Sequence, residues 1–433
     1  FFALVLSPFG AANLGFPAVI RRILRIVIQI LRSFPALILA LTATFLFGLG
    51  TFAGTFAITL YTFAIMTKLT YEDASAADVK AYQALRAMGV SKYVAYIHGI
   101  LPEIIPGFLT NALYLLETNV RHSSILGYVG AGGIGLLLNE KISWLEYDKV
   151  GTILLMLFLT VCVIEYFSRY LAALIRKERT IKKEQARLLL LFLAALFLIC
   201  TFTLSLPDFS RTSPQTLRNM FAGFLQPDWS FFFSAEKDGL GYLLLETVCI
   251  AFIGTVIGAI VSAPLAFLNT KRFVPAPVSF LFNLVIMVIR SVPFLVYGLI
   301  FIRVSGPGAF TGVLTLAVCS IGLLTKRFTE ALDALDPRPY HALLAMGVRP
   351  LPAICHSVLP QLKPVFTSII LYRFDVNIRE ASVLGLVGAG GIGAPLIFSM
   401  NQYAWEKAGA IMLGLILFVW FIDMVSEKIG AGN

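Results

Sequence analysis

The chain has 433 residues, of which 58% are hydrophobic and only 13% are charged, and its mean hydropathy is +0.85. A soluble domain carries roughly 25% charged residues, so this composition excludes an ordinary soluble globular protein. The net charge of +10 does not indicate nucleic-acid binding, because the Lys and Arg residues are confined to short connections between apolar stretches.

Long apolar stretches predict membrane-spanning helices. Four of them are almost free of charge: 188–206, 241–268, 310–324 and 408–422. Most are long enough to cross a hydrocarbon core about 30 Å thick. A transmembrane barrel would instead need segments of about ten residues that alternate between polar and apolar side chains. We therefore expect an all-α polytopic membrane protein.

The basic connections between apolar stretches predict the orientation in the membrane. They include residues 21–25, 68–92, 176–187, 271–272 and 326–349. Under the positive-inside rule these connections are cytoplasmic. The polar segment 207–238 has no basic excess, so we expect it to be an external loop. The predicted location is the cytoplasmic (inner) membrane, with the C-terminus in the cytoplasm.

The chain repeats itself at a constant spacing of 258 residues. The match needs no insertion over roughly a hundred residues, which indicates a tandem duplication. We assign residues 1–175 to the first repeat, 176–187 to a basic cytoplasmic linker and 188–433 to the second repeat. Phe1 corresponds to about Ala259, so we expect the first copy to lack its first helix and most of its second, with the native amino terminus upstream.

Both repeats carry their basic loops on one side, so they have parallel topology. Parallel repeats are related by a pseudo-two-fold axis along the membrane normal. A solute path would then lie between the halves.

An Arg-Ser-x-Pro sequence interrupts an apolar stretch in each repeat, as Arg32-Ser33 before Pro35 and Arg290-Ser291 before Pro293. The proline predicts a kink or helix junction, where the serine can satisfy a freed carbonyl. Ionisable residues in a membrane are costly and often functional. Two roles stay open: lining the substrate path, and holding the kink.

A stretch of different character lies between two membrane helices of each repeat, at 81–102 and 339–360. Each predicts a short amphipathic helix, a glycine in a left-handed cap, a second short element and a proline that begins the next helix. The residues that we expect to carry this function are Ala84, Ala87, Met88, Gly89, Ala342, Ala345, Met346 and Gly347.

This stretch resembles the EAA loop of ABC-importer permeases, the coupling helix that docks on the ATPase subunit. One loop in each repeat matches an ATPase dimer. The alternative is a pair of ordinary cytoplasmic helix-turn-helix connections. A well-capped element of this size suits the transmission of a rigid-body movement.

A glycine-rich block follows in each repeat, at 119–135 and 377–393. Its glycines are Gly130, Gly132, Gly133, Gly135, Gly388, Gly390, Gly391 and Gly393. They fit G-x-G-x-x-G, but a dinucleotide site needs a soluble βαβ unit, which this context excludes. We expect the glycines to allow close approach at the interface between the halves. The block and the preceding Leu371-Tyr372-Arg373-Phe374 resemble phosphonate-import permeases.

Two arginines and two asparagines of this block are candidate substrate-path residues. Arg121 and Arg379 follow the helix that leaves the coupling loop, with Asn119 and Asn377 two residues earlier. Arginine pairs well with phosphonate oxygens, so both arginines could line an anion path. The alternative is local pairing, since Glu117 lies near Arg121 and Glu380 is adjacent to Arg379.

The remaining chemistry-bearing residues give no sign of a catalytic or metal site. The five cysteines have no paired spacing, and we expect them to be buried small hydrophobes. His98 and His356 are expected to be interfacial packing residues. The chain has no G-x-x-x-x-G-K-S/T loop, so we expect no bound cofactor and no enzyme activity, with ATP and Mg on a partner subunit.

The resemblance implies an ATPase dimer at the cytoplasmic face, an extracytoplasmic phosphonate-binding protein, and phosphonate or phosphite as the solute, in a lipid bilayer and without nucleic acid. Its fold would be that of a type I ABC-importer permease. Three alternatives stay open: an importer of another small solute, an ion-coupled secondary transporter, which also uses parallel repeats, and a structural membrane scaffold.

Overall fold

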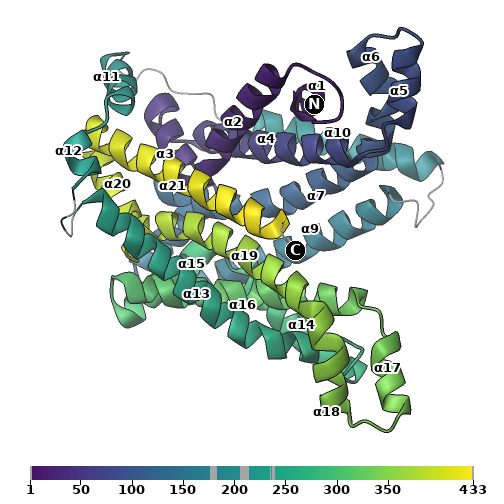
Figure 1. Cartoon of the computed structure of the whole chain (residues 1–433). Helices are drawn as coiled ribbons and strands as arrows, with labels where there is room; N and C mark the ends of the chain where they lie inside the picture. Colours follow the sequence, from purple (N-terminus) through teal and green to yellow (C-terminus); the bar gives the residue numbers. More distant parts are fainter. Residues whose placement is uncertain (1, 176–182, 205–213, 235, 237–238, 432–433) are drawn as a thin grey trace. The chain divides into compact units, whose positions relative to one another are not determined.

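The computed structural model describes residues 2–175, 183–204, 214–234, 236 and 239–431, and every regular element within these ranges is helical (Figure 1). The predicted all-α class is therefore confirmed. Internal packing divides the chain into two compact units, Phe1–Leu217 and Arg218–Asn433. This division places the helix Lys183–Phe202 with the first unit, whereas the sequence assigned residues from 188 onward to the second repeat. Residues 176–182 of the predicted linker and the last two residues lie outside the described ranges.

The first unit consists of helices that follow one another with short connections. In chain order they are α1 (Phe2–Gly10), α2 (Ala18–Ser33), α3 (Ala36–Phe47), α4 (Thr51–Ala76), α5 (Lys80–Ala87), α6 (Lys92–Gly99), α7 (Leu101–Leu126), the 3₁₀ turn η1 (Gly127–Val129), α8 (Ile134–Ser143), α9 (Tyr147–Ile175) and α10 (Lys183–Phe202).

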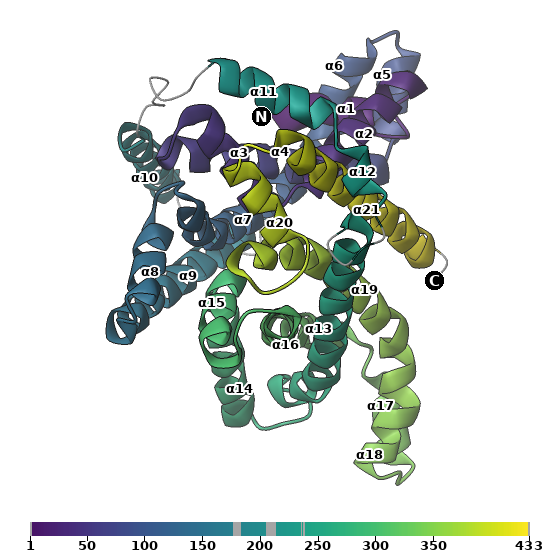
Figure 2. The ribbon, with the colours of Figure 1, turned by 90° about the vertical axis from the view of Figure 1, so that its left-hand side faces the viewer.

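The second unit repeats this order. After α11 (Pro214–Leu225), which crosses the unit boundary, come α12 (Trp229–Phe232), α13 (Leu240–Asn269), α14 (Ala276–Ser291), α15 (Phe294–Ser305), α16 (Ala309–Ala334), α17 (Arg338–Ala345), α18 (Pro350–Ala353), the π-helical turn η3 (Ile354–Val358), α19 (Leu359–Leu384), the 3₁₀ turn η4 (Gly385–Val387), α20 (Gly393–Asn401) and α21 (Trp405–Ala431). In Figure 2, α16 is seen end-on between α13 and the pair α14–α15.

Within the described ranges, six helices are long and apolar enough to span a membrane, and three bent pairs could raise that number to nine. The α2–α3 and α14–α15 pairs bend by 89° and 85°. Both bends fall at the Arg-Ser-x-Pro sequences, where proline lacks the N–H that would continue the helix. The predicted kinks are confirmed.

The duplication is visible in unusual backbone angles. Gly89 and Gly347 have φ values of 84° and 80°. Leu145 and Tyr403, also 258 residues apart, are the non-glycine residues of the described ranges with positive φ, at 60° and 57°. Left-handed backbone is unfavourable for such side chains. A repeated strain of this kind indicates that both units share one local architecture, as the sequence predicted.

Two sequence expectations need correction. The segment 207–238 is not a continuous loop, because it holds α11 and α12, although several of its polar residues lie outside the described ranges. The cysteines are not uniformly buried: Cys319 is buried and Cys162 half-buried, whereas Cys200, Cys249 and Cys355 are exposed on helix surfaces.

Candidate coupling and transport site

The predicted coupling loop of the first unit is a hairpin of α5 and α6. The amide of Val90 donates to the carbonyl of Leu85 at 3.2 Å and that of Gly89 to Arg86 at 3.1 Å. This pattern, with Gly89 in the left-handed conformation, is a Schellman cap. Tyr82 fastens the hairpin to its unit, because its hydroxyl donates to the carbonyl of Leu14 at 2.6 Å.

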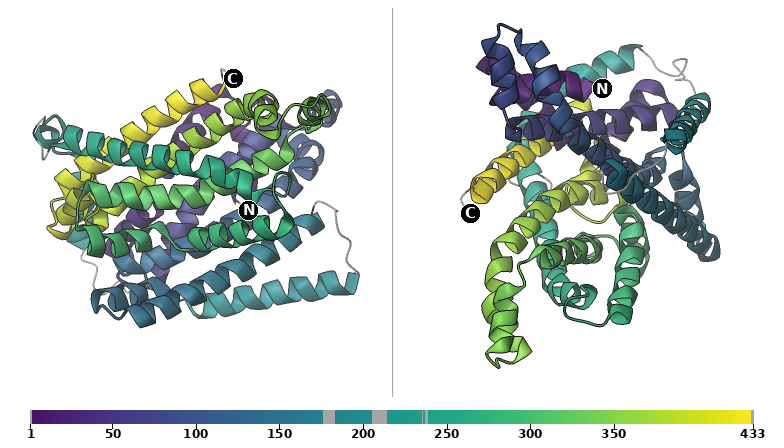
Figure 3. Two further views of the ribbon diagram at one scale, coloured as in Figure 1. Left: turned by 90° about the horizontal axis from the view of Figure 1, so that it is seen from below. Right: turned by 90° about the vertical axis from the view of Figure 1, so that its right-hand side faces the viewer.

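The second unit repeats the hairpin with one change. Val348 donates to Leu343 at 3.1 Å and Gly347 to Leu344 at 3.0 Å, which forms the same cap. The element after the cap differs from α6, because it consists of the short α18 and the π-helical η3. Figure 3 shows this hairpin in light green, projecting beyond the long helix that follows it.

The tips of both hairpins are free to meet another surface. Met88 and Met346 are 71% and 79% exposed. The other residues predicted for coupling are exposed as well: Ala84, Ala87, Gly89, Ala342, Ala345 and Gly347. Small side chains around one flexible, apolar methionine form a surface that can fit into a groove.

The glycine blocks allow close contacts within each unit. Gly50 donates its amide to the carbonyl of Gly130 at 3.1 Å, and Gly308 donates to Gly388 at 2.9 Å. A Cβ atom at Gly132 would lie 2.8 Å from a side-chain carbon of Thr51, and one at Gly390 would lie 2.8 Å from the backbone of Ala309.

Other glycines of the blocks lie where the turn itself leaves no room for a side chain or needs a left-handed backbone. A Cβ at Gly135 or Gly393 would collide with the carbonyl oxygen of Ser124 or Ser382. Gly133 and Gly391 require positive φ. Close approach is therefore confirmed inside each unit, between the block and the start of α4 or α16. The expected role between the halves stays a prediction.

A buried polar cluster joins three helices of the second unit. Asn377 of α19 donates to Thr255 of α13 at 2.7 Å and to Ser320 of α16 at 2.9 Å. Arg373 donates to the same Ser320 hydroxyl at 3.1 Å and pairs with Glu380 at 2.8 Å. Because an α-helix turns about 100° per residue, Arg373, Asn377 and Glu380 share one face of α19.

The opposite face of α19 carries a second ion pair. Arg379 Nη2 lies 2.5 Å from Asp375 Oδ2, and both side chains are mostly buried. The equivalent pair of the first unit joins Arg121 to Glu117 at 3.0 Å. Local pairing is therefore confirmed for Arg121. Arg379 also pairs locally, but with Asp375, whereas Glu380, the partner expected from the sequence, pairs with Arg373.

The first unit keeps only part of the polar cluster. Asn119 of α7 donates to Thr62 of α4 at 2.9 Å, at positions equivalent to Asn377 and Ser320. Leu115 and His122 stand where the second unit has Arg373 and Glu380. The sequence drew attention to Asn119 and Asn377 but not to this buried ion pair. The signal was the simultaneous change of two positions between the repeats.

The serines at the two bends make hydrogen bonds within their own helices. The hydroxyl of Ser33 donates to the carbonyl of Gln29 at 2.9 Å, and that of Ser291 donates to Val288 at 2.7 Å. Each serine thus satisfies a carbonyl near the break, as expected. Arg32 and Arg290 lie in the last turns of α2 and α14 and are half-buried. His98 and His356 are exposed, and their expected role as interfacial packing residues stays a prediction.

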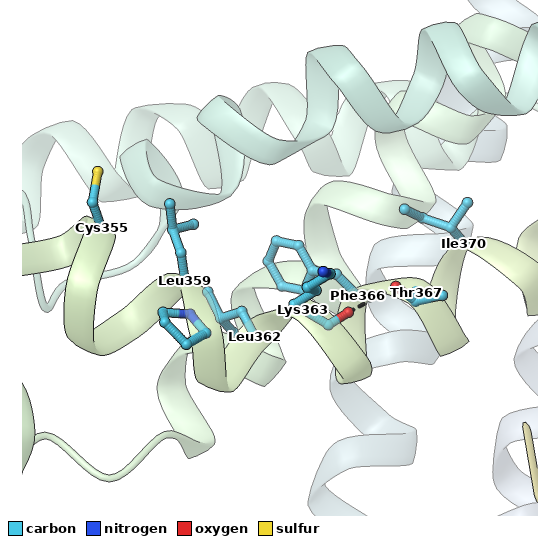
Figure 4. A pocket seen from close by; sticks show the side chains of 8 residues that line it. Cys355, Leu359, Leu362, Lys363, Phe366, Thr367 and Ile370 are labelled. Atoms are coloured by element: carbon cyan, nitrogen blue, oxygen red, sulfur yellow. Dashed lines mark hydrogen bonds between the residues drawn. The ribbon is translucent and has the colours of Figure 1, made fainter. Parts of the chain in front are cut away.

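A shallow pocket of about 530 Å³ lies along the first half of α19 (Figure 4). Its lining is apolar except for Lys363 and Thr367, and includes Cys355, Leu359, Phe366 and Ile370. No cluster of His, Cys, Asp or Glu in the described part of the chain could hold a metal ion.

Comparison with models of known protein families decides the family of this chain. The model of the binding-protein-dependent transport system inner membrane component matches residues 4–180 and again 254–429. The chain belongs to this family. It is a multi-span permease of an inner-membrane transport system, with the family domain present twice in tandem.

Curated relatives cover one or both units of this permease. The phosphate-import permease of Mycolicibacterium smegmatis is 28% identical, over 95% of this chain and 77% of its own length. A phosphite transport system permease of Stutzerimonas stutzeri is 36% identical, over 42% of this chain and 67% of its own length. A solved methionine ABC transporter is similar to 44% of this chain at 18% identity, covering 96% of its own chain with a TM-score of 0.40.

Proposed function

We propose that this permease forms the membrane path of an ABC importer for phosphorus oxyanions: phosphonate, phosphite or phosphate. The observation that carries the proposal is the relationship to a phosphate-import permease along 95% of the chain. Permeases named for phosphite and phosphonate transport are also similar to parts of it. These solutes share a tetrahedral phosphorus with anionic oxygens.

The chain would work with two kinds of partner. An ATPase dimer in the cytoplasm would bind ATP and Mg and dock on the two hairpins, and an extracytoplasmic binding protein would deliver the solute. The exposed tips at Met88 and Met346, each behind a rigid Schellman cap, support the docking role. Closure of the ATPase dimer would push both hairpins and alternate the access of the solute path to the two sides of the membrane.

Arg121 of α7 and Arg379 of α19, at equivalent positions of the two repeats, are the proposed anion-contacting groups. Arg121 and Arg379 each have a carboxylate partner four residues earlier, which keeps the resting helix neutral in a medium where an isolated charge is costly. A phosphorus oxyanion offers the same pattern of acceptor oxygens as a carboxylate. It can therefore compete for these guanidinium groups. Asn119 would hold α7 against α4, and Asn377 would hold α19 against α13 and α16. The residues of the bends, Arg32, Ser33, Arg290 and Ser291, would maintain the breaks after α2 and α14.

The test is the ATPase activity of the chain reconstituted with its ATPase and binding-protein subunits. We expect stimulation by methylphosphonate, phosphite or phosphate, and none by sulfate. Stimulation by an unrelated solute would keep the importer and overturn the substrate class. Uptake driven by an ion gradient without any ATPase would favour the secondary transporter, and the paired hairpins argue against that alternative.

A further inference from the structure

The two carboxylate oxygens of Asp375 have different surroundings. Oδ2 accepts the hydrogen bond of Arg379 at 2.5 Å. Oδ1 is buried and accepts no hydrogen bond from any residue that the structure describes. Asp375 as a whole is only 7% exposed. A buried acceptor without a donor costs free energy, so its retention in a membrane helix points to a function.

The other polar groups of α19 do not supply that donor. Asn377, Arg373 and Glu380 occupy the opposite face, where their hydrogen bonds go to one another, to Ser320 and to Thr255. Asp375 therefore shares its face with Arg379. This face combines a guanidinium donor with a free carboxylate acceptor.

A donor and an acceptor side by side define the chemistry of a ligand. An ionised carboxylate can only accept hydrogen bonds, so the ligand atom against Oδ1 must carry a hydrogen. Arginine donates to anionic oxygens. The ligand that fits both is an oxyanion that also bears a hydroxyl. A fully deprotonated oxyanion would place a negative oxygen against Asp375 and be repelled.

We propose that Arg379 and Asp375 together select oxyanions that retain a proton. Arg379 binds the deprotonated oxygens and Asp375 Oδ1 accepts the P–OH hydrogen, so Asp375 is a specificity-determining residue. The proposal rests on the proposed function. Phosphate and alkylphosphonates carry such a hydroxyl near neutral pH, whereas sulfate and sulfonates do not.

The first unit supports this interpretation and offers a control. Glu117 makes the same pairing with Arg121 four residues later, so a carboxylate beside the arginine occurs in both repeats. Asp375→Glu keeps the acceptor and copies the residue of the first unit. Asp375→Asn keeps the shape but adds an N–H₂ donor, which favours an unprotonated oxygen. Asp228→Asn makes the same chemical change at a helix cap of the second unit, where asparagine serves equally well.

The experiment measures equilibrium binding to the complex of the full chain with its ATPase subunits, without the binding protein, whose own selectivity would otherwise enter. The probes are two pairs of similar shape: methylphosphonate with methanesulfonate, and phosphate with sulfate. We expect the wild type, Asp375→Glu and Asp228→Asn to prefer the phosphorus compound. We expect Asp375→Asn to lower that preference by about ten- to a hundredfold, the worth of one charged hydrogen bond.

The outcomes separate the inference from the function on which it rests. Wild type that binds sulfate as tightly as phosphate overturns the inference, even if Asp375→Asn does not fold. An unchanged preference in folded Asp375→Asn also overturns it, while the substrate class stands. Wild type that binds neither phosphorus compound overturns the inference, and the substrate class is then decided separately by the ATPase stimulation measured with the binding protein present.

Discussion

At the scale of single residues, the clearest difference between the two units is a buried ion pair that only the second unit has at these positions. The Arg373–Glu380 pair of α19 is replaced by Leu115 and His122 at the equivalent positions of α7. A buried ion pair adds little net stability compared with well-packed apolar groups, but the loss of one partner leaves a costly unpaired charge. The two positions must therefore change together, as they have between the repeats.

We predict that Arg373→Leu and Glu380→His are each more harmful than both changes combined. Glu380→His leaves Arg373 buried without its carboxylate and should cost about 3 kcal/mol. The double variant copies the first unit and should lie within about 1 kcal/mol of wild type. Denaturant unfolding of the purified chain measures the three values. Additive effects of the single changes would contradict the coupling.

The sequence predicted the partner of Arg121 but not that of Arg379. Adjacent residues on a helix point in different directions, whereas residues four apart lie on one face. Glu117 satisfies this spacing for Arg121, and Asp375 satisfies it for Arg379. Arg373 and Glu380 are two turns apart, so their pairing needed the helix geometry as well as the spacing.

At the scale of elements, replacement of a glycine by alanine should cost very different amounts of stability at different turns. A Cβ at Gly393 would meet Ser382 O and Leu386 N, both backbone atoms that cannot move aside. A Cβ at Gly347 would have no neighbouring atom within 4 Å, but the φ of this residue is +80°. We expect Gly393→Ala to cost about 3 kcal/mol or more, and Gly347→Ala about 1 kcal/mol. Thermal unfolding compares them, and equal losses would refute the assignment.

Helix α12 should be sensitive to acid through its N-cap. The hydroxyl of Ser230 and the amide of Phe231 donate to Asp228 and hold its pKa below the ordinary value. A lowered pKa means that the cap stabilises the fold above the unfolded pKa and is lost as the pH falls through the folded pKa. Asp228→Ala should loosen α12 by about 1 kcal/mol at neutral pH, and Asp228→Asn by much less.

Hydrogen exchange of the α12 amides, compared between variants at each pH, measures this effect. Wild type and Asp228→Ala should converge under strongly acidic conditions, below the lowered pKa. A difference that persists there would show that the carboxylate charge is not the stabilising group. No pattern in the sequence indicated α12, because its four residues lie in a polar segment that was expected to be a loop.

At the scale of the whole molecule, the repeat made most of the architecture predictable. One offset predicted the paired bends, the two Schellman-capped hairpins and the recurring glycine turns. It could not predict the differences, such as the π-helical turn before α19, because a repeat describes only what its copies share. Local residue spacing also could not predict to which unit α10 belongs, because that depends on packing between helices, and packing places α10 in the first unit.

The predicted orientation can be tested with repeat-equivalent cysteines. Met88 and Met346 lie at the hairpin tips, whereas Trp144 and Gln402 lie at the turns after α8 and α20. Figure 1 shows α17 and α20 at opposite ends of the helices of the second unit. In a chain whose native cysteines are replaced, a membrane-impermeant maleimide should label Trp144→Cys and Gln402→Cys in intact cells. It should label Met88→Cys and Met346→Cys only after lysis, because the basic loops are cytoplasmic. The reverse pattern would invert the topology, and a pattern that differs between the repeats would contradict parallel topology.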